Sequence, residues 1–129
     1  MIYILLNLGP IAAATLLGLA IGLVWLRASG MLLPGWAALA GAALAEFWLA
    51  AILAGALILA PPEAGAWVMA VGSAVVIWIG FVVPVLWVTF MAHGMAPRQT
   101  VSAALHWLAV MLGQAVLMQG IGLVPPPAA

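Results

Sequence analysis

Charge is almost absent from this chain of 129 residues. Only 3% of the residues are charged, two of them basic and two acidic, and the net charge is zero. Soluble domains contain about 25% charged residues, so this chain cannot build an ordinary water-facing surface. Zero net charge also excludes the basic patch by which proteins bind nucleic acid. The remaining sequence is 70% hydrophobic, which is typical of a membrane protein.

Cysteine is missing altogether. Its absence excludes disulfides, thiol catalysis and cysteine-ligated metals. Aspartate is missing too, and the few serines and two histidines show no spacing that would combine a nucleophile, a base and an orienting group. No metal-ligand cluster or phosphate-binding loop is visible. We therefore expect a non-enzymatic protein without a metal site.

Long apolar blocks, separated by proline, glycine and charge, fill the chain. They show no alternation of apolar and polar residues, which excludes a transmembrane barrel and leaves helices. Each block holds roughly 24 residues, enough to cross about 30 Å of hydrocarbon. The first exceeds a signal-peptide core and has no preceding basic residue, so we expect a retained span. The sequence predicts one all-α integral membrane domain, a four-transmembrane-helix bundle with helices at about 3–26, 36–59, 66–91 and 99–123.

The two arginines predict the orientation of the bundle. Arg27 ends the first span and Arg98 follows the third, so both lie on one side of the membrane. The positive-inside rule makes this side cytoplasmic and both termini extracytoplasmic. We also expect both arginines to act as topology anchors that contact lipid phosphate.

Small residues predict close helix packing. Ala14, Gly18 and Gly22 form a small-xxx-small face on the first span. On the last span, Gly113 shares a face with His106, whereas Ala115 lies on the opposite face, toward lipid or a neighbour.

The third span contains Gly80 four residues before Pro84. Proline removes a helix hydrogen bond and clashes with the carbonyl group of Gly80, which predicts a kink and a packing site. The pattern Gly80-x-x-x-Pro84-x-x-Trp87 also echoes Gly18-x-x-x-Gly22-x-x-Trp25. This echo fits two pseudo-repeated helical hairpins, but shared membrane composition explains it as well.

A family resemblance rests on two features of the sequence. They are the segment Trp78-Ile79-Gly80-Phe81-Val82-Val83-Pro84 and the later His106 in the last span. Together with the first span's Gly22-Leu23-Val24-Trp25, they resemble the small bacterial four-span membrane proteins of the family catalogued as domain of unknown function 1761. The resemblance implies a four-helix fold in the bacterial inner membrane and confers no activity. The stretch after the motif, Val88 to Gly94, departs from the family's Asn-Tyr and Gly-Arg pattern.

Glu46 is the most informative single residue. It lies about 15 Å into the second span, near the bilayer midplane, where a carboxylate is costly and often functional. One hypothesis is a proton, cation or ligand site. The favoured alternative is a neutral or hydrogen-bonded Glu that joins helices, with His106, Gln114 or another subunit as its partner.

His106 lies about 9 Å into the last span from the arginine side. An interhelical hydrogen bond is the favoured role. A chlorin or haem ligand is the alternative, because Ser102 at i−4 is small and leaves room beside the imidazole ring. Asn7 and Gln119 lie near helix ends and receive no special role.

Three functions are compatible with these features, and we expect the first. The first is an accessory or assembly subunit that packs in a larger membrane complex, with lipid, other subunits or itself as partners. The second is a small homo-oligomeric transporter or channel for protons, cations or a small solute that uses Glu46. The third is a pigment- or haem-binding bundle that uses His106.

Overall fold

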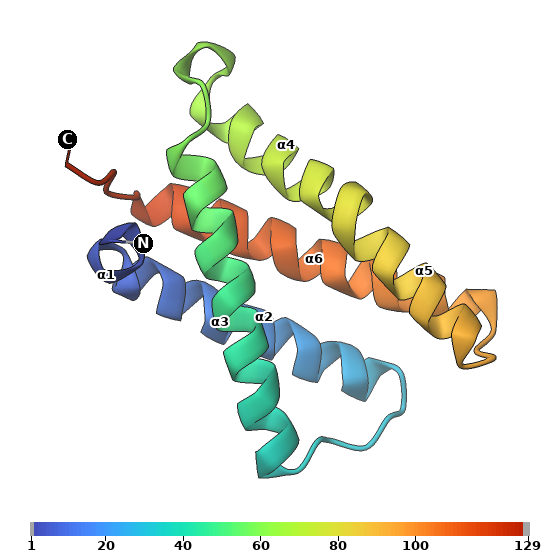
Figure 1. Cartoon of the computed structure of the whole chain (residues 1–129). Helices are drawn as coiled ribbons and strands as arrows, with labels where there is room; N and C mark the ends of the chain where they lie inside the picture. The colour runs from blue at the N-terminus through green and yellow to red at the C-terminus, as the bar shows by residue number, and fades with distance from the viewer. Residues whose placement is uncertain (1, 128–129) are drawn as a thin grey trace.

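The computed structural model describes residues 2–127 and, within that range, contains helices, turns and extended segments but no strand (Figure 1). Four helical stretches are long and apolar enough to cross a membrane: Leu8–Ala28, Trp36–Ile58, Ala66–Ala92 and Pro97–Ile121. This architecture confirms the predicted all-α, four-span fold and is that of a multi-pass membrane protein. The helices in chain order are α1 (Ile2–Leu6), α2 (Leu8–Ala28), α3 (Trp36–Ile58), η1 (Pro62–Ala64), α4 (Ala66–Ile77), η2 (Trp78–Val82), α5 (Val83–Ala92) and α6 (Pro97–Ile121).

Glycine and proline end the helices. Gly30 and Gly94 follow α2 and α5 with φ values of 69° and 67°, a region that glycine adopts without strain. Pro97 begins α6, where its missing N–H group is not needed. The backbone N–H group of Ala96 donates to Oε1 of Gln99 at 2.9 Å and closes this end of the helix.

Helix α6 is the centre of the bundle. It contacts α2, α3, α4 and α5, whereas α2 contacts neither α4 nor α5. Figure 1 shows α3 crossing α2 and α6 steeply, with α4 and α5 alongside α6. Ala115 was predicted to face lipid or a neighbour, and the structure has the second: Ala115 is fully buried, because α6 has neighbours on most of its sides. The core gathers small and apolar side chains: Ile11, Ala14, Ala50, Ala51, Leu53, Ala54, Ala74, Met111, Ala115 and Met118.

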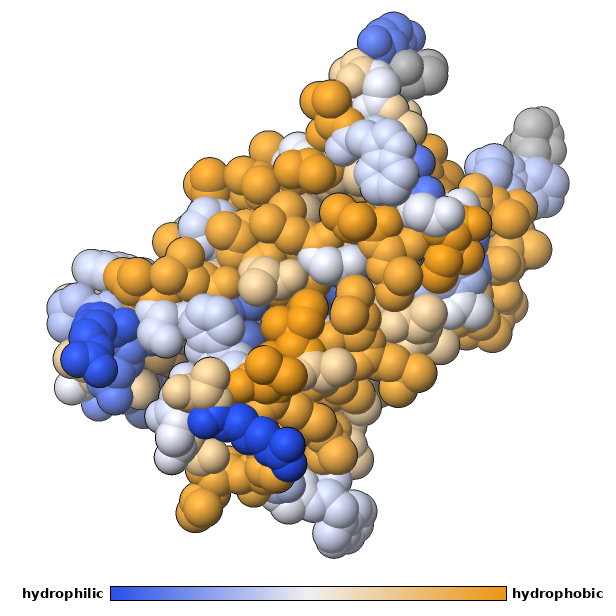
Figure 2. All heavy atoms as spheres, turned by 180° about the vertical axis from the view of Figure 1, so that it is seen from behind, coloured by the Kyte–Doolittle hydropathy of each residue, from blue (hydrophilic) through white to orange (hydrophobic). Residues whose placement is uncertain are grey.

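The first half of α3 leaves the bundle. Residues 36–45 are exposed, apart from the half-buried Leu39 and Ala43. In the third span, only Ala70 and Ala74 are buried. Most of the face in Figure 2 is hydrophobic, and strongly hydrophilic residues gather mainly at its ends. Lipid or another protein must therefore cover large apolar surfaces of α3, α4 and α5.

The third span is not a regular α-helix. Its residues Trp78–Val82 form a π-helical turn directly before Pro84, and the N–H group of Val83 donates to the carbonyl oxygen of Trp78. A π-helical turn takes up the disturbance that proline causes in the hydrogen-bond ladder. Gly80 and Pro84 are exposed, and no atom lies within 4 Å of a Cβ placed on Gly80. The predicted packing role of these two residues therefore does not apply within the chain.

Candidate functional site

Glu46 lies where α3 crosses α2. Its side chain is only 4% exposed, although the half-helix before it is open. A Cβ placed on Gly18 would overlap the Glu46 carboxyl group. The small-residue face of α2 thus makes room for a polar side chain and does more than bring two backbones together.

Gln114 on α6 completes this contact. Its Nε2 atom donates to Oε2 of Glu46 at 3.3 Å, and both side chains are buried. The same Nε2 atom lies 2.8 Å from a Cβ placed on Gly18. From the sequence, the hydrogen-bond partner of Glu46 could be His106, Gln114 or another subunit. In the structure, the partner is Gln114. Three helices therefore meet at one polar contact inside an apolar bundle.

His106 lies against the next small residue of α2. Its Nε2 atom is 3.5 Å from a Cβ placed on Gly22 and is buried without a hydrogen-bond partner. The imidazole ring contacts Trp25 and Trp107, with centroid separations of 5.7 and 5.3 Å. Gly18 and Gly22 are four residues apart, so the Glu46 and His106 contacts are about 6 Å apart along the α2 axis.

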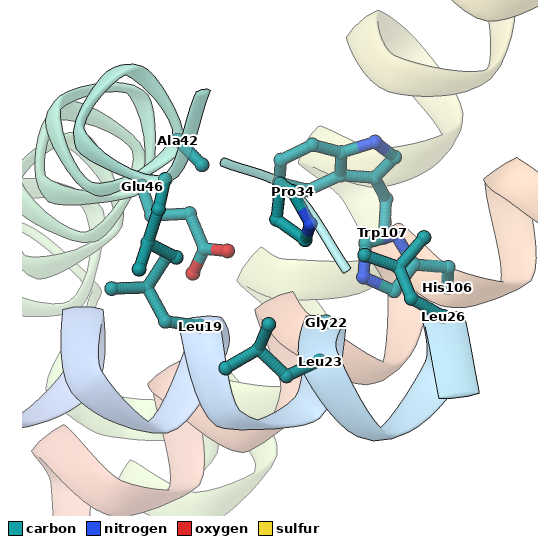
Figure 3. Close-up of a pocket in the computed structure, with 10 residues that line it drawn as sticks. Leu19, Gly22, Leu23, Leu26, Pro34, Ala42, Glu46, His106 and Trp107 are labelled. Carbon is teal, nitrogen blue, oxygen red and sulfur yellow. The ribbon is translucent and has the colours of Figure 1, made fainter. Parts of the chain in front are cut away.

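A cavity of about 170 Å³, which we call the inner pocket, connects these two residues. Figure 3 shows the Glu46 side chain and the His106 ring facing this space from α3 and α6. The other walls are apolar or small. The residues that line the inner pocket are Leu19, Gly22, Leu23, Leu26, Pro34, Leu39, Ala42, Glu46, His106 and Trp107.

A second cavity of about 490 Å³, which we call the outer pocket, lies at the arginine end of the bundle. It is more polar than the inner pocket, and His106 lines both. Helices α2, α5 and α6 and both loops at this end contribute to it. Its lining consists of Trp25, Ser29, Met31, Phe90, Met95, Arg98, Gln99, Ser102, Ala103 and His106.

The remaining predicted residues divide into two groups. Ala14 is fully buried in the core, and a Cβ placed on Gly113 would lie 3.0 Å from Ile21. Both residues therefore serve close packing of α2 against its neighbours. Arg27 and Arg98 are both exposed, near the ends of helices that the outer pocket joins.

Two polar contacts between distant parts of the chain lie outside the predicted site. Asn7 separates α1 from α2, so the predicted first helix at 3–26 is interrupted there, and the Asn7 side chain is fully buried. Its Nδ2 atom donates to the carbonyl oxygen of Val124 at 2.8 Å, and its Oδ1 atom accepts from the N–H group of Val124 at 2.7 Å. The amide side chain therefore holds the C-terminal segment in place, a role that its position near a helix end did not reveal.

Trp78 makes the second such contact. Its Nε1 atom donates to the carbonyl oxygen of Ala104 at 2.7 Å, which ties the π-helical turn to α6. The segment that carries the family resemblance thus has a structural role in this chain.

The donor set does not favour a metal or a macrocycle. No group of three or more potential metal ligands occurs in the part of the chain that the structure describes. The Nε2 atom of His106 is enclosed beside Gly22, so a haem or chlorin could bind this nitrogen only if α2 and α6 separated. Ser102 and His106 both line the outer pocket, whereas Ser102 does not line the inner one.

Comparisons with family models, with curated proteins and with solved structures found no match to this chain. The resemblance carried by the segment 78–84 stays a prediction. Function is therefore argued from the geometry of the helices, the Glu46 contact and the two pockets.

Proposed function

We propose that this chain is a non-enzymatic subunit that packs against other transmembrane helices in a larger complex of the bacterial inner membrane. Its arginine end would face the cytoplasm and both termini the opposite side. The observation that carries the proposal is the first half of α3, which extends from the bundle and is exposed on nearly all sides. This half consists mainly of alanine and glycine.

Gly41 is the most telling residue of this half-helix. Glycine inside a helix costs about 1 kcal/mol relative to alanine. Apart from the neighbouring backbone of α3 itself, no atom lies within 4 Å of a Cβ placed on Gly41, so packing within the chain does not explain the glycine. Close approach by the backbone of a partner helix would explain it, since small residues permit such contacts in membranes.

Glu46 has a structural role in this proposal. Its carboxyl group joins α3 to α6 through Gln114 and lies over Gly18 of α2. The contact fixes the crossing point of α3 and thereby the direction in which its exposed half extends. A residue with this role needs neither a substrate nor a catalytic partner.

The test is native mass spectrometry of the chain after gentle solubilisation. We expect the wild-type chain to be recovered with other membrane subunits in fixed stoichiometry. Gly41→Leu should release them, because the new side chain would occupy the interface. Ala12→Leu is the control, since Ala12 is also a small exposed residue but lies on α2, outside the apolar surfaces of α3, α4 and α5. Recovery of the wild type only as a monomer or homodimer would contradict the proposal.

The inner pocket favours a second candidate, passage of protons, cations or a small solute through a homo-oligomer. The pocket leads from His106 to Glu46, and intramembrane pairs of these residue types often mark such pathways. In reconstituted vesicles, Glu46→Gln would then abolish uptake, whereas Glu63→Gln would leave it unchanged. Equal flux in the wild type and Glu46→Gln would reject this candidate.

A further inference from the structure

The outer pocket combines a cation with an apolar wall at the end of the bundle. Arg98 lines it in the first turn of α6, beside Gln99 and Ser102, while Trp25 and Phe90 line it from α2 and α5. Its volume of about 490 Å³ falls in the range of small-molecule sites. The pocket therefore has the size to hold an amphiphile, a cationic side for its head group and an apolar wall for its hydrocarbon part.

The polar groups of the outer pocket are mainly hydrogen-bond donors. The Arg98 guanidinium group has five N–H donors and no acceptor. The Oε1 atom of Gln99 already accepts from the backbone of Ala96, which leaves its amide N–H groups to donate. An anion with several acceptor oxygens complements this set.

The chain itself supplies no such anion at this end. Its two acidic residues are Glu46 and Glu63. Glu46 is buried against Gln114, and Glu63 lies in η1, on the connection between α3 and α4 at the opposite end. A counter-ion for Arg98 must therefore come from outside the chain.

We propose that the outer pocket binds one anionic amphiphile, with its phosphate or carboxylate head on Arg98 and its apolar part against Trp25 and Phe90. Arginine suits both head groups because its planar guanidinium group pairs with two oxygens at once. The site lies at the helix ends, at the depth of lipid head groups. The amphiphile is either a bilayer phospholipid or a free fatty acid, and these two share the recognised chemistry. This proposal does not depend on the proposed assembly function.

The experiment measures the thermal unfolding midpoint of the purified full chain in neutral detergent. The titrants are phosphatidylglycerol, oleate, phosphatidylcholine and inorganic phosphate. We expect phosphatidylglycerol or oleate to raise the midpoint saturably, and the more effective of the two identifies the source of the anion. Phosphatidylcholine and inorganic phosphate should have little effect, since one has no net charge and the other no apolar part. Stabilisation by all lipids alike, or by phosphate alone, would overturn the proposal.

Arg27 provides the matched control. It carries the same charge at the same end of the bundle but does not line the outer pocket. Arg98→Gln should weaken binding of the anionic amphiphile about tenfold or more, because it removes charge-assisted hydrogen bonds. Arg27→Gln should change it less than about twofold, as expected of an exposed surface charge. Equal weakening in both variants would show attraction to the surface charge alone and overturn the proposal.

A second variant tests the pocket without changing any charge. Ser102→Leu would fill part of the cavity and keep both arginines. It should also weaken binding about tenfold or more. This result stays measurable if Arg98→Gln fails to fold. Unchanged affinity in Ser102→Leu, with the helical circular dichroism spectrum intact, would exclude the outer pocket as the site.

Discussion

The carboxyl group of Glu46 occupies the space that a side chain at Gly18 would fill. Gln114 donates to this carboxyl group from the third helix of the contact. The small-residue face of α2 therefore receives polar side chains from α3 and α6, with Glu46 and Gln114 at Gly18 and His106 at Gly22. The crossing of α2 and α3 therefore lies at Glu46, the residue of the second span whose insertion into the bilayer costs the most free energy.

Gly18→Ala should destabilise the fold. The new methyl group would overlap the Glu46 carboxyl group and lie 2.8 Å from Nε2 of Gln114. Overpacking of this kind costs about 1–3 kcal/mol, measurable as a loss in the free energy of unfolding during titration with a denaturing detergent. Gly22→Ala is the control, because its methyl group would meet Nε2 of His106 at an ordinary 3.5 Å. Equal stability of the two variants would contradict the arrangement.

A double-mutant cycle between positions 18 and 46 should show strong coupling. Glu46→Ala removes the group with which the methyl of Gly18→Ala overlaps. The double variant should therefore lose at least about 1 kcal/mol less than the sum of the two single losses. The same unfolding titration measures all four proteins. Additive losses would place the carboxyl group away from Gly18.

Glu46→Leu should destabilise the protein more than Glu46→Gln. Leucine leaves the Gln114 amide buried without a partner, whereas glutamine retains an acceptor oxygen. Interhelical hydrogen bonds in membranes contribute about 0.6 kcal/mol on average and up to about 1.7 kcal/mol. The free energies of unfolding of Glu46→Leu and Glu46→Gln should differ by an amount in this range. In the Gln114→Leu background, the difference between the two Glu46 variants should disappear. Persistence of the full difference there would assign it to another contact.

Asn7→Ala should release the C-terminal segment. The substitution removes both hydrogen bonds to Val124, each worth roughly 0.5–1.5 kcal/mol, and the bond to the carbonyl oxygen of Tyr3. Hydrogen exchange at the Val124 amide should become faster. Asn7→Asp is the comparison, since it retains an acceptor for this amide and should preserve more of the protection. Unchanged exchange in Asn7→Ala would show that another contact holds the segment.

Trp78→Phe should weaken the attachment of the third span to α6. The substitution keeps an aromatic ring but removes the N–H group that donates to Ala104. We expect a loss of about 0.5–1.5 kcal/mol in the free energy of unfolding. Trp87→Phe, in the same span and 46% exposed, should cost less. A larger loss at Trp87 than at Trp78 would argue against the bond.

The polar contacts show how far sequence patterns reach in this chain. The rarity of charge identified Glu46, the family resemblance and the depth in the last span identified His106, and four-residue spacing identified Gly18 and Gly22. The sequence did not predict which residue bonds Glu46. Gln114 and His106 are both on α6, and each lies at a depth in the membrane from which it could reach Glu46. The contacts of Asn7 and Trp78 could not be predicted, since their partners are backbone groups 117 and 26 residues away.

The residues were enough to predict a helical chain, four stretches that can span a membrane and their approximate ends, because hydrocarbon admits only long apolar segments with internally bonded backbones. Three features became visible only in the folded chain: the central position of α6, the crossing of α3 at Gly18 with its first half exposed, and the bond between Glu46 and Gln114. Nearly every face of these helices is apolar, so hydrophobic periodicity does not separate a face toward lipid from one toward a neighbour. Only the fit of side chains at the crossings makes that choice.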